Sequence, residues 1–236
     1  AQKTLFNELA RSEIETSCII KTQKPTIQKI RGLARQPLLY HQHMLRIDYE
    51  DTKSISKEDE QRIFSLIKQK INLFDAIILS DYAKGTLTED LVKSLIQLAK
   101  EKNKLITADC KPINLEFYKN VDLLKPNKKE AIEMTLTENI EEAGKKLVQK
   151  LNSSIVITRG AEGFSVFEKN NNVFHLPANV KEVYDVAGAG DTVIAVLTLA
   201  LLSGYSLKEA VWLADKAAGI VISKPGVATV SKEELE

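Results

Sequence analysis

Short apolar runs alternate with helical patterns through the middle of the chain, and this alternation constrains the fold more than any other feature. Each run is rich in Ile, Leu and Val and is bounded by polar or turn residues, as expected of strands buried on both faces. The runs are Asp75–Asp81, Lys104–Asp109, Val121–Pro126 and Ser154–Gly160, and the helical patterns are Lys57–Ile71, Thr88–Lys102, Lys128–Thr135 and Ile140–Leu151. The alternation predicts a parallel sheet covered by helices on both sides.

Two other segments break this rhythm. Residues 163–177 contain two short strand patterns around an Asn-rich turn, which predicts a hairpin. Residues 26–48 carry β-leaning pieces that fit a small sheet outside the main one. The first residues already follow a helical pattern and include no Met, so we expect that residues are missing upstream.

Composition limits the partners. The chain has 236 residues, 44% of them hydrophobic, enough for a single domain with one good-sized core. Its formal net charge of +1 provides no overall field for nucleic acid or a membrane, so we expect a small-molecule partner. Two cysteines without a framework pattern, no signal peptide and no apolar run of the ~20 residues needed to span a bilayer together predict a cytoplasmic protein.

The stretch Asp185–Val193, DVAGAGDTV, precedes a long apolar helix pattern. A turn through Gly188, Ala189 and Gly190 into a helix exposes backbone amides at the positive end of the helix dipole, where phosphate oxygens bind. Asp191 then lies in the first turn. It either caps the helix or acts as a base beside the bound anion, and local sequence alone favours the cap. The spacing fits neither a Walker loop nor a dinucleotide fingerprint.

Other segments accompany this stretch in a fixed order: SDYAKG at 80–85, PNKKE at 126–130 and ITRG at 157–160. Together they resemble the ribokinase-like (PfkB) family of carbohydrate kinases, and SDYAKG resembles its heptose 7-phosphate kinase branch. The resemblance implies an α/β three-layer sandwich with a mostly parallel central sheet and a small β-lid within about residues 24–50. It also implies ATP-dependent phosphorylation of the anomeric hydroxyl of D-glycero-D-manno-heptose 7-phosphate to the 1,7-bisphosphate, in ADP-heptose synthesis for lipopolysaccharide.

The resemblance assigns catalytic and nucleotide-binding roles. Asp191 matches the catalytic base, and the backbone amides from Ala187 through Gly188 and Ala189 to Gly190 match the anion hole. Asn127 and Glu130 match a motif that holds Mg²⁺ through water, although a helix cap with its capping-box partner explains the same pair. The nucleotide-binding matches are Thr158 and Gly160, for which an ordinary turn is the alternative. Lys111 is a candidate to neutralise phosphate charge, and Asp215 stands near the adenine, where heptose kinases usually carry Asn.

The remaining assignments concern the sugar phosphate and a monovalent cation. Lys84, Arg31 and Arg35 are candidates to bind the sugar phosphate, with a solvated surface as the alternative. Asp185 matches a position that helps to bind K⁺ in many family members. The lid strands imply a homodimer, although strand edges can equally be covered internally.

Departures from the family leave other functions open. Residues 36–40, QPLLY, resemble an insertion in the lid, and the family's N-terminal Gly-Gly strand has no counterpart. One alternative is a related kinase for another phosphosugar or a nucleoside. The other, if that strand is absent in the cell, is a nucleotide-binding module without catalysis.

Overall fold

The central sheet has six strands in the order β3-β4-β5-β6-β7-β8. In this computed structural model, the described residues are 2–36, 39–179 and 184–235, with the side chains of residues 2, 31 and 33–43 left out of the description. The strands are β3 (Ala76–Ser80), β4 (Leu105–Asp109), β5 (Leu123–Leu124), β6 (Ser154–Thr158), β7 (Phe164–Phe167) and β8 (Val173–Leu176). The pairs from β3 to β6 are parallel and the last two are antiparallel. The mostly parallel sheet and the 163–177 hairpin are thus confirmed.

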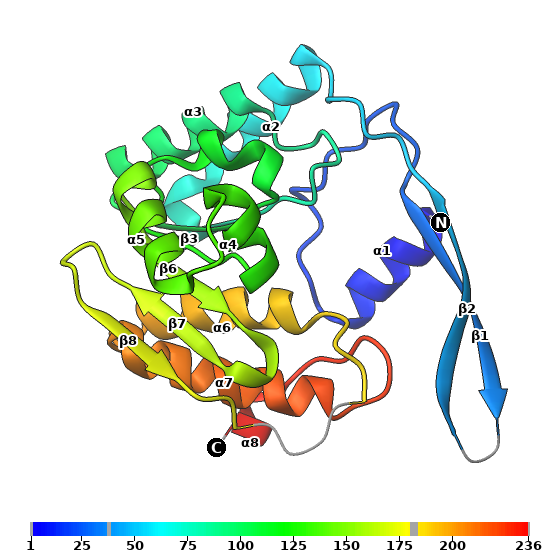
Figure 1. The fold of residues 1–236 in the computed structure, drawn as a ribbon. Helices are drawn as coiled ribbons and strands as arrows, with labels where there is room; N and C mark the ends of the chain where they lie inside the picture. The colour runs from blue at the N-terminus through cyan, green and yellow to red at the C-terminus, as the bar shows by residue number, and fades with distance from the viewer. Residues whose placement is uncertain (1, 37–38, 180–183, 236) are drawn as a thin grey trace.

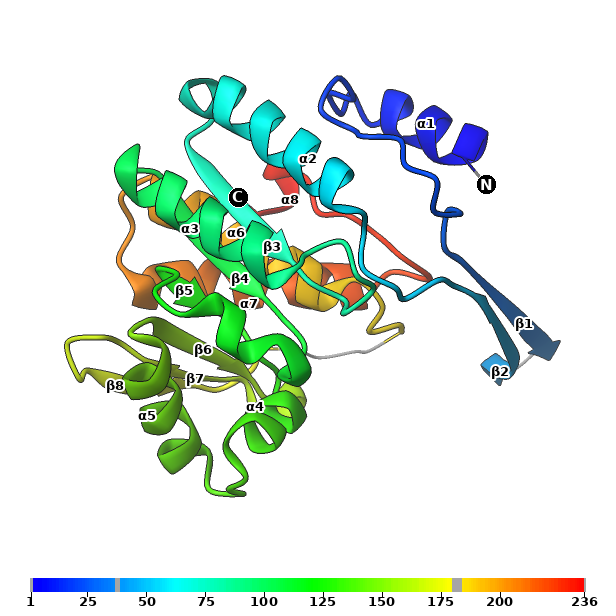
Figure 2. The same cartoon turned by 90° about the horizontal axis from the view of Figure 1, so that it is seen from above.

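Helices cover both faces of this sheet (Figures 1 and 2). One face carries α2 (Lys57–Lys70), α3 (Glu89–Glu101), α4 (Lys128–Thr135) and α5 (Ile140–Leu151). The other face carries α6 (Ala189–Leu202) and α7 (Leu207–Ile222), followed by the short α8 (Lys232–Leu235). Short 3-10 segments lie at Ile71–Leu73, Pro112–Tyr118 and Gly160–Glu162. The arrangement is the predicted three-layer sandwich.

Local chemistry fixes the ends of several helices. Thr88 caps α3 by accepting from the backbone N–H of Leu91, and Asn139 caps α5 in the same way. Ser206 and Glu209 form a capping box at the start of α7. Polar residues placed before amphipathic runs are strong signals, which is why the sequence located these helices closely.

The fifth strand is shorter than its apolar run. The sequence predicted 121–126, whereas β5 is Leu123–Leu124. Asp122 and Lys125 still donate backbone hydrogen bonds to Ile106 and Ala108 of β4. Pro126 has no N–H to donate, so regular pairing ends before it.

Two apolar cores pack on opposite faces of the sheet. The larger one lies under α3, α4 and α5, and the second lies between the sheet and the α6–α7 pair. Thr198 of α6 also hydrogen-bonds Thr107 of β4 between the buried hydroxyls at 2.7 Å, which ties α6 to the sheet. Across the described ranges, no helix is both long and apolar enough to cross a bilayer.

The predicted lid strands form a separate two-stranded antiparallel sheet of β1 (Gln28–Gln36) and β2 (Leu39–Tyr49). The hairpin projects from the body, as Figure 1 shows, and the chain begins with α1 (Gln2–Arg11). Residues 37 and 38 of the expected insertion lie outside the described residues, and residues 36 and 39 are the last pair toward the hairpin tip.

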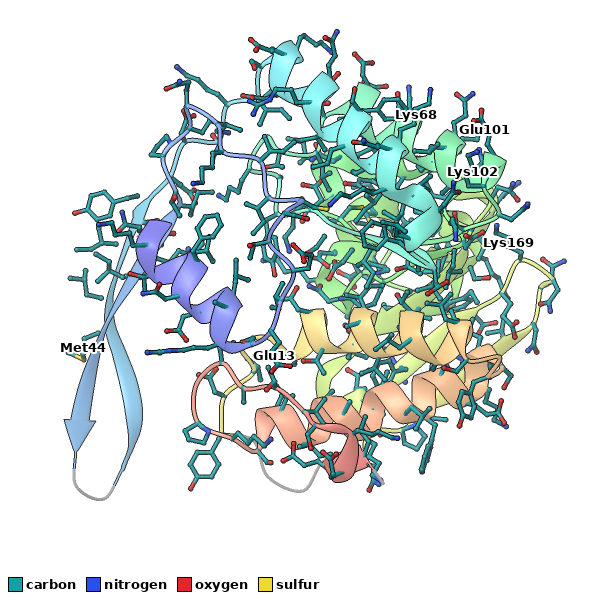
Figure 3. All side chains as sticks on the ribbon, turned by 180° about the vertical axis from the view of Figure 1, so that it is seen from behind. Glu13, Met44, Lys68, Glu101, Lys102 and Lys169 are labelled. Atoms are coloured by element: carbon teal, nitrogen blue, oxygen red, sulfur yellow. The ribbon has the colours of Figure 1, made fainter. Side chains whose placement is uncertain are left out.

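The two faces of the hairpin differ. Opposite residues in an antiparallel pair share a face, so the pair Ile30–Ile47 lies on the same face as Leu45 and Tyr49. All four side chains are exposed. The register shifts next to Met44, whose side chain is 68% exposed and projects into solvent (Figure 3). The opposite face carries Lys29 paired with Asp48.

Candidate functional site

The carboxyl ends of the parallel strands bring the candidate residues to one edge of the sheet. Parallel strands all end at the same edge, where ligands bind in open α/β sheets. Tyr82 follows β3, Lys111 follows β4, Asn127 follows β5 and Gly160 follows β6. The beginning of α6 reaches this edge, because Asp191 contacts Tyr82.

The turn into α6 has the geometry that the Gly-Ala-Gly sequence predicts. Gly188 adopts a left-handed φ of +86° as the residue before the helix, which a residue without Cβ accepts readily. The amide of Ala187 donates to Asp185 Oδ1 at 2.9 Å, and that of Ala189 donates to the Val186 carbonyl at 3.3 Å. Within the described part of the chain, the amides of Gly188 and Gly190 donate no hydrogen bond. These two amides, rather than all four from 187 to 190, are free for an anion.

Asp191 does not use its side chain to cap α6. Among the described residues, no side chain caps the start of this helix by a hydrogen bond. Its two carboxylate oxygens instead lie 2.7 and 2.8 Å from the phenol oxygen of Tyr82. Partial burial and the hydrogen bond to Asp191 raise the pKa of Tyr82 to about 12, so the phenol stays protonated and donates.

Asn127 and Glu130 form a capping box at the start of α4. Asn127 Oδ1 accepts from the Glu130 amide, and Glu130 Oε2 accepts from the Asn127 amide, both at 2.9 Å. Glu130 Oε1 lies 2.6 Å from Lys111 Nζ. Partial burial disfavours the charged ammonium of Lys111, but Glu130 outweighs it and the pKa of Lys111 is raised. The three residues line a cavity of about 310 Å³.

This group suits a hydrated cation better than a directly coordinated one. Carboxylate and amide oxygens are ligands that Mg²⁺ accepts, and Mg²⁺ commonly keeps several waters. Both Glu130 oxygens already accept hydrogen bonds, although each retains a free lone pair. Over the residues that the structure describes, no cluster of three or more His, Cys, Asp or Glu could hold a metal directly.

A buried ion pair lies beside the turn into α6. Lys125 Nζ is 2.7 Å from Asp109 Oδ2, and the Lys125 side chain is only 3% exposed. Burial raises the pKa of Asp109, although Lys125 opposes this shift. A Cβ built on Gly190 would lie 3.4 Å from Lys125 Nζ and 3.9 Å from Asp109 Oδ2. The second glycine of the turn thus leaves room for a buried positive charge.

Thr158 and Gly160 lie next to the α4 cap. Thr158 forms an isolated parallel β-bridge with Asn127. The Thr158 amide donates to the Pro126 carbonyl at 3.0 Å. Gly160 has a φ of +58° and open space where a Cβ would be. Between them, Arg159 has a buried Nε without a hydrogen-bond partner among the described residues.

A second cavity, of about 580 Å³, lies between the end of β3 and the base of the hairpin. Tyr82, Lys84, Lys29 and Asp81 contribute to its lining. Lys84 Nζ pairs with Glu50 at 2.6 Å, at the end of the hairpin. Arg31 and Arg35 belong to β1, but their side chains lie outside the described residues.

The two remaining candidate carboxylates are Asp185, shortly before the Gly188 turn, and Asp215 of α7. The amides of Tyr184 and Asp185 both donate to the Ile222 carbonyl at the end of α7, so the segment before the motif is anchored there. Asp215, on α7, is 5% exposed and accepts from the Asn179 amide at 3.1 Å. Burial raises the pKa of Asp215.

Several polar residues of this edge escaped the sequence analysis. Tyr82 was noted only as part of SDYAKG, and Lys125 and Asp109 were assigned to strands. Asp81 is buried and accepts from Tyr118 Oη at 2.8 Å and Asn114 Nδ2 at 2.7 Å. A charged residue directly after a buried strand was the available signal, because such positions face the ligand edge of a parallel sheet.

Known proteins resemble the chain over most of its length. Bifunctional protein HldE of Haemophilus ducreyi is 39% identical over 233 residues, covering 97% of this chain and 47% of that protein. Bifunctional protein HldE of Proteus mirabilis is 39% identical over 241 residues, covering 100% of this chain and 49% of that protein. The chain therefore spans about half the length of these curated relatives.

Solved structures share the fold. Ribokinase from Thermotoga maritima superposes with a TM-score of 0.72 at 18% identity, covering 99% of this chain and 75% of that one. Phosphofructokinase-2 from Escherichia coli in complex with potassium gives 0.67 at 18% identity, covering 81% and 64%. The pfkB family carbohydrate kinase profile matches residues 1–234. The chain therefore belongs to the pfkB family of carbohydrate kinases.

Proposed function

We propose that this chain is an ATP-dependent kinase that phosphorylates the anomeric hydroxyl of D-glycero-D-manno-heptose 7-phosphate. The product is the 1,7-bisphosphate, a precursor of ADP-heptose for lipopolysaccharide. The observation that carries the proposal is the beginning of α6: a left-handed Gly188, two free amides and, in the first turn, an Asp191 that does not cap the helix. The SDYAKG segment, which resembles the heptose 7-phosphate kinase branch, is the reason for choosing a heptose as substrate. The two HldE relatives at 39% identity support that choice.

Asp191 is the general base of this reaction. The sugar oxygen attacks the γ-phosphorus of ATP as the bond from that phosphorus to the β,γ-bridging oxygen breaks, and ADP leaves. The hydroxyl proton passes to the Asp191 carboxylate. The amides of Gly188 and Gly190 stabilise the charge that develops on the transferred group, because fixed dipoles need no reorganisation.

Lys111, Asn127 and Glu130 hold the phosphate end of the nucleotide. The Asn127–Glu130 pair binds a hydrated Mg²⁺ through water, while Lys111 supplies a positive charge beside it. The metal ion, when bound, neutralises phosphate charge. Thr158 and Gly160 line the path of the nucleotide, supported by their position next to Asn127. Asp215, near the middle of α7, lies at the adenine end of the proposed nucleotide site.

The cavity at the base of the hairpin receives the sugar phosphate. Lys84 leaves its ion pair with Glu50 and binds the phosphate. Arg31 and Arg35 of β1 are the other candidates to bind it. Asp185, with carbonyls at the end of α7, binds K⁺; the hydrogen bonds from residues 184 and 185 to Ile222 support that placement.

A second copy of the chain covers the exposed apolar face of the hairpin. Ile30, Leu45, Ile47 and Tyr49 present a contiguous apolar surface on a strand pair that projects from the body. Such surfaces mark protein interfaces more often than they stay in water. We infer a homodimer through β1 and β2.

The first experiment replaces Asp191 by Asn in the intact protein. The amide keeps the shape but accepts a proton poorly, so turnover of heptose 7-phosphate should fall by at least ~10², with ATP affinity nearly unchanged. Fructose 6-phosphate and ribose, assayed in parallel with the unaltered protein, should turn over poorly. Near-normal turnover by Asp191→Asn would remove the base from its role, and a preference for another sugar would replace the substrate.

A further inference from the structure

Tyr82 connects the two halves of the candidate site. It follows β3 on one side, and its phenol reaches the carboxylate of Asp191 in the first turn of α6. The oxygen–oxygen distances of 2.7 and 2.8 Å are those of charge-assisted hydrogen bonds. Tyr82 also lines the cavity at the base of the hairpin, so one residue borders this cavity and contacts the candidate base.

The backbone before the ring is held in place by a buried carboxylate. Asp81 is 6% exposed and accepts three hydrogen bonds: from the Ala83 amide at 2.7 Å, from Asn114 and from Tyr118. Ala83 has a φ of +54°, a left-handed conformation that a non-glycine residue adopts only where its surroundings impose it. Tyr82 is therefore bracketed by a fixed turn.

The backbone after the ring is fixed as well. A Cβ built on Gly85 would lie 2.1 Å from the Lys53 carbonyl oxygen, so the two backbones touch. The Ile55 amide donates to the Gly85 carbonyl at 2.8 Å, and Lys24 Nζ donates to the Lys84 carbonyl at 3.0 Å. A loop fixed on both sides directs its side chain reproducibly.

The environment of the phenol makes it a donor rather than a competing base. Its raised pKa of about 12 keeps the proton on the oxygen at neutral pH. Lys111 Nζ lies 5.8 Å from the ring centroid, on the nucleotide side. With one proton, the phenol can donate to one carboxylate oxygen at a time, which leaves the other oxygen to accept from a substrate hydroxyl.

We propose that Tyr82 is a positioning residue that holds one carboxylate oxygen of Asp191 and directs the other toward the sugar hydroxyl. This inference rests on the proposed function, in which Asp191 is the base. Tyr82 transfers no proton. Its hydrogen bond keeps the Asp191 side chain from rotating away from the sugar hydroxyl. Tyr82 therefore affects the rate only by orienting Asp191, the group that reacts.

The test is Tyr82→Phe, which removes the phenol oxygen and keeps the ring that lines the cavity. We expect kcat to fall roughly tenfold, the order expected for one hydrogen bond to a charged group. The KM for ATP should stay within twofold, and so should the KM for the sugar. The matched control is Tyr205→Phe, an exposed tyrosine after the far end of α6, which should change nothing.

The same variants separate this inference from the proposed function. Loss of turnover in Asp191→Asn with a reduced kcat in Tyr82→Phe supports both. Loss in Asp191→Asn with a normal kcat in Tyr82→Phe overturns the positioning role and leaves the kinase. Turnover retained in Asp191→Asn overturns the base, and the positioning role with it.

A readout that needs no turnover checks the contact itself. In protein labelled at tyrosine Cζ, the Tyr82 resonance is identified by its loss in Tyr82→Phe. Asp191→Asn should shift this resonance and leave that of Tyr205 in place, because only Tyr82 loses a carboxylate acceptor. An unmoved Tyr82 resonance would overturn the inference whatever the assay shows.

Discussion

At the scale of single residues, Gly190 serves two purposes at the start of α6: it offers an amide to an anion and it leaves space for a neighbouring ion pair. Its amide is free for an anion, and its missing side chain leaves space beside the Lys125–Asp109 pair. Alanine would favour the helix by about 0.5–1 kcal/mol, but its methyl group would press on Lys125 Nζ at 3.4 Å. A substitution at Gly190 can therefore lower activity without lowering the stability of the protein.

We expect Gly190→Ala to lower turnover at least about tenfold, because a methyl group in the anion cradle displaces phosphate or Lys125. The unfolding midpoint should change little, since the helix gain offsets the crowding. Steady-state assays and thermal unfolding of the same samples measure both. Unchanged turnover in Gly190→Ala would mean that phosphate does not approach this amide.

At the scale of elements, α5 packs on the sheet through a glycine. A Cβ on Gly144 would lie 2.2–2.4 Å from ring atoms of Phe167 in β7. The helix therefore approaches the strand more closely than any larger residue would permit.

Gly144→Ala should lower the free energy of unfolding by about 1–3 kcal/mol, as overpacking does, despite the better helix propensity of alanine. Urea unfolding measures the change. Combining it with Phe167→Leu should cost less than the sum of the single changes, because the smaller side chain makes room. Additive costs would show that the clash is relieved elsewhere.

The hairpin is the second element with a testable role. Ile47→Asp places a charge at the centre of the exposed apolar face, which a dimer interface would have to bury unpaired. Sedimentation should then show a monomer where the unaltered chain forms a dimer. Arg46→Ala on the charged face should remain dimeric, and a dimer that survives Ile47→Asp would place the interface elsewhere.

The sequence predicted elements better than it predicted contacts. Both α4 and α5 have the predicted bounds, because Asn127 and Asn139 mark their first turns by local chemistry. The contact of Tyr82 with Asp191 could not be predicted, since it joins residues 109 positions apart through the packing of α6 under the sheet. Lys125 escaped for the same reason: a lysine in a strand pattern gives no sign that Asp109 will face it.

At the scale of the whole molecule, the proposed nucleotide site draws on both layers of helices. The Asn127–Glu130 cap belongs to α4 on one face of the sheet, and the Gly188 turn belongs to α6 on the other. A ligand held by both should oppose their separation. Its binding therefore stabilises the fold as one unit.

We expect an ATP analogue with Mg²⁺ at 100 times its Kd to stabilise the protein by about 2.7 kcal/mol. For a chain of this size, that corresponds to an increase in the unfolding midpoint of about 5–11 °C. Asp191→Asn should keep the shift, because the base does not hold the nucleotide. Omitting Mg²⁺ should reduce it, and a shift indifferent to Mg²⁺ would argue against a cation at Asn127 and Glu130.

The two faces of the hairpin have a consequence for how the enzyme responds to its substrate. Lys29 on one face lines the cavity proposed to receive the sugar phosphate, while Ile30, the next residue, lies on the face proposed to meet a second copy. Sugar binding or dimer formation that shifts this strand pair would therefore affect both faces. By thermodynamic reciprocity, whatever factor dimer formation adds to sugar affinity, sugar must add to dimer affinity. If dimer formation strengthens sugar binding, the KM for sugar should fall as enzyme concentration rises.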